Sequence, residues 1–244
     1  MQKILPLLAA GLALNLATTA QAALFDRGNG MIYDQDLNIT WLSDANYFKT
    51  QYDADNSILA TLTGQTVADS LGSYTITAAD FNTGTGEMTW WGAQAWAANL
   101  SYGGYDDWRL PTTLQPDSSC NGQSGTDSYG YICAGSELGH LFYSELGGTA
   151  GLSIVTSHDV DYDLFSNIQN SGYWSGSEYA PLPGLAWVLT TFDGWQGADG
   201  KSSPYYGWAV RSGDVASSNS VPEPGTLALL GLGAFGLRRA QRRG

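Results

Sequence analysis

Residues 103–112, GGYDDWRLPT, decide how the middle of this chain folds. Trp108 and Leu110 flank Arg109, so in an extended segment the two apolar side chains share one face and the guanidinium takes the other. Arginine is rare in this sequence, and its planar group binds a carboxylate or several carbonyls at once. We therefore expect Trp108 to be structural, and Arg109 to hold two segments together rather than to bind a ligand.

Two helices are expected on either side of this stretch, at residues 89–100 and 136–146. Trp and Ala recur at helical spacing in the first, and Thr89 can cap it. The second has an apolar face and Ser136 as its N-cap. Residues 57–71 are expected to form a short helix.

Most of the remaining sequence is typical of short strands separated by turn residues. The expected strands are residues 31–33, 39–42, 73–78, 106–112, 172–177, 186–192 and 205–211. Asp193 and Gly194 favour a hairpin turn after the sixth of these. We expect Trp174 to pack at the centre of a sheet and Arg211 to be a second structural clamp.

The N-terminal segment is typical of a secretory signal peptide. Residues 1–22 combine Lys3, a run rich in Leu and Ala, and the cleavage site Ala20-Gln21-Ala22. A retained N-terminal membrane anchor is the alternative, although the apolar run is short for spanning a bilayer.

The C-terminal segment begins with Val221, Pro222, Glu223 and Pro224, continues with an apolar run and ends with four arginines. This order resembles the PEP-CTERM signal, which implies processing by an exosortase-type transpeptidase in an exopolysaccharide setting. The apolar run covers 12 residues, against the ~20 of a perpendicular transmembrane helix. We expect residues 221–244 to contain a short transmembrane helix that is a transient inner-membrane anchor. A permanent single-pass tail is the alternative.

Between these segments we expect one domain, residues 23–212, and a polar linker, residues 213–220. Residues 23–220 contain five basic and 22 acidic side chains, a net charge of −17. Such a surface repels nucleic acid and anionic membranes. Cys120 and Cys133 lie in a Gly- and Ser-rich stretch of an exported chain, so we expect them to form a disulfide.

Five blocks of the sequence, in this order and with the tryptophan-bearing helix expected at residues 89–100 between the first two, resemble the Lcl C-terminal domain family of bacterial surface proteins. The blocks are YDQDLNITWL (33–42), GGYDDWRLPT (103–112), YWSGSE (173–178), AWVLTTFDG (186–194) and GWAVRSG (207–213). The resemblance implies an α+β, C-type lectin-like fold, with two helices flanking small twisted antiparallel sheets and long loops. Residues 114–135 are an insertion relative to the family pattern. The formylglycine-generating relatives use reactive cysteines, and that activity is not expected here because both cysteines lie in the insertion.

Asp159, Asp161 and Asp163 alternate along the chain, so in an extended segment they would point the same way. Three carboxylates converging on one point would suit calcium. The alternative is a solvated acidic loop. His158 adjoins this segment and could join a metal site, whereas His140 is expected to contribute to helix packing.

We expect an exported surface or matrix protein without enzymatic activity that binds polysaccharide or another surface component, as in a biofilm. The expected binding residues are Asp159, Asp161, Asp163, Glu178, Asp193 and Trp195. A glycan hydrolase is one alternative, and it would need Glu178 or Glu137 buried opposite an aspartate with opposed pKa values. A self-associating structural matrix component is the other.

Overall fold

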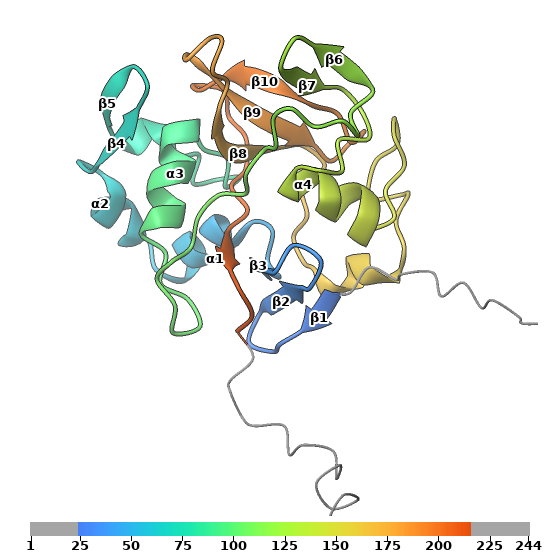
Figure 1. Cartoon of the computed structure of the whole chain (residues 1–244). Coiled ribbons are helices and arrows are strands. Elements are labelled where there is room, and N and C mark those ends of the chain that lie inside the picture. Colours follow the sequence, from blue (N-terminus) through green and yellow to red (C-terminus); the bar gives the residue numbers. More distant parts are fainter. Residues whose placement is uncertain (1–23, 216–244) are drawn as a thin grey trace, which may run out of the picture.

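The computed structural model describes residues 24–215 (Figure 1). The predictions made for residues 1–22 and 221–244 lie outside the described residues. Small antiparallel sheets and a few helices make up the described part, which confirms the α+β class.

The first sheet joins the two ends of the described chain. Its order is β1 (Leu24–Asp26), β2 (Met31–Asp34), β3 (Ile39–Leu42) and β11 (Val210–Ser212), with every pair antiparallel. The hairpin predicted for residues 31–42 is confirmed as β2 and β3. The last strand is shorter than expected, because residues 205–209 pair only through single bridges.

The second sheet has the order β10-β9-β8 and lies above the first in Figure 1. Its strands are β8 (Gly172–Glu178), β9 (Leu185–Thr190) and β10 (Gln196–Gly200). β8 and β9 were predicted. β10 was not, because its two glycines and one aspartate have low strand propensity.

Two separate hairpins complete the strands. β4 (Thr66–Asp69) pairs with β5 (Gly72–Thr75), and β6 (Gly122–Ser124) pairs with β7 (Asp127–Tyr129). The first hairpin corrects the helix predicted for residues 57–71. That region contains only a short helix before its chain turns into β4.

The helices lie around the sheets. They are α1 (Tyr47–Ala54), α2 (Ile58–Leu62), α3 (Trp90–Ala98) and α4 (Glu137–His140), with single turns η1 (Ala78–Asp80), η2 (Leu141–Glu145) and η3 (Val160–Leu164). Figure 1 shows α3 and α4 on opposite sides of the strands. The prediction for α3 is confirmed, because the Thr89 hydroxyl accepts a hydrogen bond from the Gly92 amide at 3.2 Å.

The second predicted helix differs from expectation after one turn. α4 ends at His140, and the chain continues as the π-helical turn η2, in which the Leu146 amide donates to the Leu141 carbonyl at 2.9 Å. Ser136 is at the N-cap position, but its hydroxyl accepts from the Leu114 amide instead of capping the helix.

Large aromatic side chains fill the core. Trp174 is fully buried in one apolar cluster with α3, whereas Trp41 and Trp208 are buried in a second cluster with α4. Trp108 is buried as well. Residues 106–112 are not a strand, because only Arg109 pairs there, through a bridge to Val210. These rings supply the core area that such short strands would otherwise lack.

Candidate functional site

The insertion forms a hairpin that is held against the second sheet. The predicted disulfide between Cys120 and Cys133 is confirmed, and it closes the base of β6 and β7. Next to it, Gly130 and Gln196 exchange two backbone hydrogen bonds of 2.8 and 2.7 Å. The hairpin is therefore attached to β10 at a defined position.

A groove of about 310 Å³ separates this hairpin from the face of β9 and β10. Its lining carries four aromatic rings, which belong to Tyr129, Tyr179, Trp187 and Trp195. The groove continues past Tyr179 into a second hollow of about 240 Å³, which Glu178 also lines. We call these two hollows together the aromatic groove. Its size and its mixture of rings and polar groups suit a small organic ligand or a chain segment.

Trp195 owes its position to two neighbours. A β-carbon at Gly197 would lie only 1.7 Å from a ring atom of Trp195, so the indole lies against the bare backbone of β10. Asp193 accepts hydrogen bonds from the Thr190 hydroxyl and, at 3.0 Å, from the Trp195 amide. Asp193 thus stabilises the hairpin turn and orients the backbone of Trp195.

Tyr179 is fixed in the middle of the groove. Its hydroxyl donates to the Asp127 carboxylate at 2.8 Å, and its ring meets Trp187 edge to face at 5.3 Å. The hydrogen bond to Asp127 raises the pKa of Tyr179. The phenol therefore stays neutral at neutral pH, and it presents an oriented apolar ring with a polar tip.

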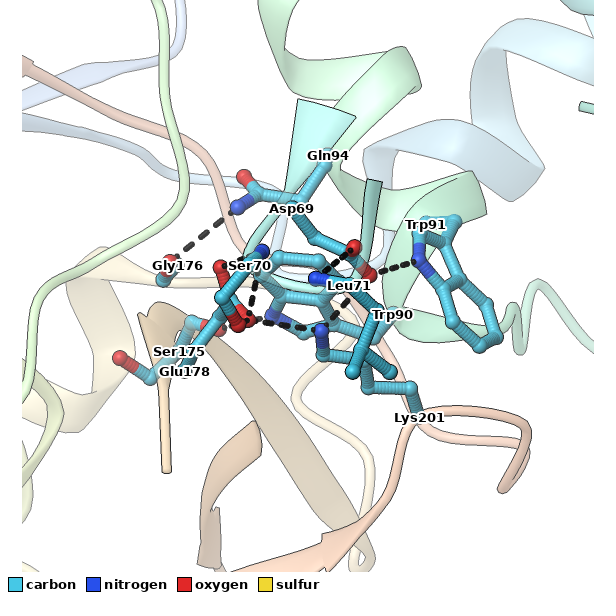
Figure 2. Close-up of polar contacts among 10 residues, drawn as sticks. All are labelled: Asp69, Ser70, Leu71, Trp90, Trp91, Gln94, Ser175, Gly176, Glu178 and Lys201. Carbon is cyan, nitrogen blue, oxygen red and sulfur yellow. Dashed lines mark hydrogen bonds and ion pairs between the residues drawn. The ribbon is translucent and has the colours of Figure 1, made fainter. Parts of the chain in front are cut away.

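Behind the groove, Lys201 binds two carboxylates in the interior (Figure 2). Its Nζ lies 2.8 Å from Asp69 and 2.9 Å from Glu178, and its side chain is 0% exposed. The ammonium also lies over the ring of Trp90, 4.5 Å from the centroid. A buried cation is tolerated only when ion pairs and hydrogen bonds replace the water that it has lost. We call Lys201, Asp69 and Glu178 the lysine cluster.

Asp69 is held ionised. Burial alone would raise the pKa of Asp69, but hydrogen bonds from Lys201, Trp91 and the Leu71 amide lower it to about 2. Glu178, which also receives hydrogen bonds from Ser70, has a lowered pKa for the same reason.

This depression of the Asp69 pKa predicts acid sensitivity. A group whose folded pKa is lowered contributes stability above its unfolded pKa, near 3.8, and loses it as the pH falls towards the folded value. For Asp69 this lowers the free energy of unfolding by about 2 kcal/mol between pH 4 and pH 2. We expect Asp69→Asn to flatten the pH dependence of the free energy of unfolding in this window, as measured by denaturant titration. Parallel curves for the two proteins would contradict this assignment.

Comparison with known proteins identifies two family models that match parts of this chain. A family model described as the Lcl C-terminal domain matches residues 30–211. The chain belongs to the Lcl C-terminal domain family. A second family model, the PEP-CTERM protein-sorting motif, matches residues 220–243. No curated protein and no solved structure matches the chain.

The sorting motif identifies an exported protein whose C-terminal signal is processed by an exosortase. Among residues 24–215, no helix has the length and apolar character needed to cross a bilayer. The transmembrane run predicted for residues 226–237 lies outside that part of the chain.

In this Lcl C-terminal domain the two motif arginines bind carboxylates. Arg109 contacts Glu137 through two hydrogen bonds of 2.7 Å, which join residues 103–112 to α4. Arg211 binds Asp107 at 2.7 Å and 3.0 Å, which joins the same stretch to β11. Both guanidiniums are engaged within the fold.

The acidic segment has a different geometry from the one assumed for calcium. Asp161 and Asp163 lie on the 3₁₀ turn η3, and Asp159 caps it by accepting from the Asp161 amide at 2.9 Å. At about three residues per turn, residues two apart point in different directions. The expected common direction of the three carboxylates is therefore wrong, and none of the three lines the aromatic groove. Of the predicted binding residues, Glu178 and Trp195 alone line the groove.

The surroundings of the two histidines differ from those expected, because His140, and not His158, lies beside carboxylates. His158 stacks on Tyr162 with ring centroids 4.1 Å apart. His140 lies 2.9 Å from the buried carboxylate of Glu145 and close to that of Asp34. Burial alone would lower the pKa of His140, but the two carboxylates raise it, while burial raises the pKa of Glu145 and of Asp34.

Proposed function

We propose that this exported protein binds a neutral polysaccharide in the aromatic groove and catalyses no reaction on it. The observation that carries the proposal is the placement of Trp195, whose indole lies against the backbone of Gly197 and lines the groove instead of filling the core. An aromatic face offers a large apolar area to the C–H face of a sugar ring. Asp127 and Ser124 line the same groove and supply polar partners for hydroxyl groups.

The charge distribution supports a neutral ligand. Every basic side chain of residues 24–215 is engaged in an ion pair within the fold. An acidic polysaccharide would meet a strongly negative surface and no free cation among those residues. A neutral chain avoids this repulsion.

The chemistry of the nearby acids supports binding without hydrolysis. Asp69 and Glu178 lie together, but the same ammonium lowers the pKa of both, so neither is a proton donor near neutral pH. Glu137 is bound by Arg109 and by the Thr112 amide. Glycoside hydrolysis needs one raised and one ordinary pKa across the bond that breaks.

We also propose that the domain is C-type lectin-like and acts at the cell surface or in an exopolysaccharide matrix. The pairing of the last strand, β11, with the N-terminal hairpin supports the fold assignment, as do α3 and α4 on opposite sides of the strands. The sorting motif supports the location. The insertion, as one wall of the groove, would give this chain its own ligand preference.

The exported protein, purified in mild detergent, should bind immobilised neutral glucans better than a uronate polymer. Trp195→Ala should weaken glucan binding by about 30-fold, because the loss of one stacked ring is worth on the order of 2 kcal/mol. Phe192→Ala is the matched control, since this exposed ring belongs to the same hairpin but does not line the groove. Affinities can be measured by calorimetry with soluble oligosaccharides.

Gly197→Ala tests the same idea without removing a lining side chain. The added methyl group has to displace the Trp195 indole, so binding should fall while the melting temperature reports whether β10 stays folded. Equal glucan binding by Trp195→Ala and the wild type would overturn the groove assignment. Concentration-dependent assembly without any sugar binding would favour a structural matrix component instead.

A further inference from the structure

A second site lies on the other side of the molecule, where the N-terminal hairpin meets α4. Asp34 ends β2, His140 ends α4 and Glu145 ends the π turn η2. Each of the three offers one ligand atom, and these atoms lie within 4.8 Å of one another. Within residues 24–215 no other set of three His, Cys, Asp or Glu side chains is arranged closely enough to hold an ion.

Each carboxylate of this cluster has one buried oxygen without a regular hydrogen bond. Asp34 accepts from the Leu37 amide with Oδ1, and the indole N–H of Trp41 lies near its carboxylate, but Oδ2 of Asp34 and Nε1 of Trp41 are both buried and outside hydrogen-bond geometry. Glu145 faces His140 with Oε1, while its Oε2 is also buried and unpaired. Both residues are 0% exposed. Unsatisfied carboxylate oxygens are costly in a protein interior, so their presence calls for a cation.

The charge and the donor atoms select the kind of cation. Two carboxylates face a single imidazole, so a divalent ion bound to a neutral His140 would bring the group to zero net charge. Calcium and magnesium prefer oxygen donors, whereas an imidazole nitrogen together with carboxylates suits zinc. Tetrahedral zinc at ~2.0–2.2 Å from each ligand needs donors about 3.3 Å apart, which the cluster reaches with small side-chain adjustments.

We propose that Asp34, His140 and Glu145 bind a zinc ion, with water at the fourth position. His140 has a 13% exposed side chain, whereas Glu145 has none, so the ion would enter on the imidazole side. Bound there, it would fasten the β2–β3 hairpin to α4. This inference does not depend on sugar binding in the aromatic groove.

The local backbone explains how the two helical ligands meet. Residues five apart point in different directions on an α-helix of 3.6 residues per turn. The π turn from Leu141 to Glu145 is wider, and it brings Glu145 within 2.9 Å of His140. Such turns are rare, and they occur frequently at functional sites.

The test uses zinc chloride and the full exported protein, stripped with a chelator and titrated in competition with a chromogenic indicator. We expect one zinc ion per chain, a higher melting temperature with zinc, and an X-ray absorption spectrum with nitrogen and oxygen ligands only. Glu145→Gln and Asp34→Asn preserve side-chain shape, and each should weaken zinc binding by at least ~100-fold.

His158→Ala is the matched control, because it removes the other histidine of the chain and should leave the zinc affinity unchanged. Asp161→Asn tests the acidic segment in the same way. The proposal is overturned if the folded wild-type protein takes up no zinc at micromolar concentration. It is also overturned if Glu145→Gln, folded by circular dichroism, binds zinc as the wild type does, or if the spectrum contains sulfur.

Discussion

Lys201→Met is expected to lower the free energy of unfolding by about 3 kcal/mol, because it leaves the buried carboxylate of Asp69 and the partly buried carboxylate of Glu178 without their cation. Lys201 is 0% exposed and Asp69 is 4% exposed, so water cannot replace the lost ammonium without opening the structure. Methionine keeps most of the aliphatic stem of Lys201, which limits the loss of packing, although the contact of the ammonium with the Trp90 ring is lost. Guanidinium unfolding at pH 7, followed by tryptophan fluorescence, measures the change.

The control for this variant removes the charges on both sides. Adding Asp69→Asn and Glu178→Gln to Lys201→Met should recover most of the lost stability, because neutral buried amides cost far less than buried carboxylates. A single variant as stable as the wild type would mean that the lysine cluster is hydrated. No recovery in the triple variant would mean that Lys201 acts through packing rather than through charge.

The lysine cluster also illustrates what the sequence could not predict. Lys201 lies in the run GADGKSSP, which is typical of an exposed turn, and its partner Asp69 is 132 residues away. No periodicity or motif links such distant positions. The elements with strong local signals were predicted, namely the hairpin of β2 and β3, α3 with its Thr89 cap, and the strands β8 and β9.

The aromatic groove was predicted only in part. Trp195 was proposed as a binding residue because it is an aromatic side chain in the expected loop 193–200. Tyr129 and Trp187 were not, because a ring in a short strand has the same sequence signature in a core and in a groove. Whether these rings lie in a core or in a groove depends on the position of the insertion, which is set by the pairing of Gly130 with Gln196.

The zinc ligands were missed for a local reason. Ser136 to Leu146 has an apolar face with the spacing of an α-helix, so residues five apart were not expected to meet. The π turn breaks that spacing after His140 and turns Glu145 towards it. Asp34 directly follows the expected strand 31–33, a position that favours a turn, since Asp is common where strands end. Only the tertiary fold brings these three together.

Trp174→Ala should lower the free energy of unfolding by about 3–5 kcal/mol, the usual cost of a large cavity in a core. Trp174 is 0% exposed, packs edge to face on Tyr205 at 5.0 Å, and donates its indole N–H to the Met88 carbonyl at 3.0 Å. Chemical denaturation gives the value.

Two matched variants separate the contributions of ring and hydrogen bond. Trp174→Phe keeps an aromatic ring but removes the indole donor to the Met88 carbonyl, which still accepts from the Tyr205 amide at 3.2 Å. It should therefore cost less than the alanine variant, with about 1 kcal/mol from the lost bond. Trp195→Ala, at the half-buried ring beside β10, should cost far less stability and should act on sugar binding instead. If Trp174→Ala and Trp195→Ala were equally destabilising, Trp195 would be part of the core. A ring whose packing stabilises the fold to that extent would not be free to stack on a ligand.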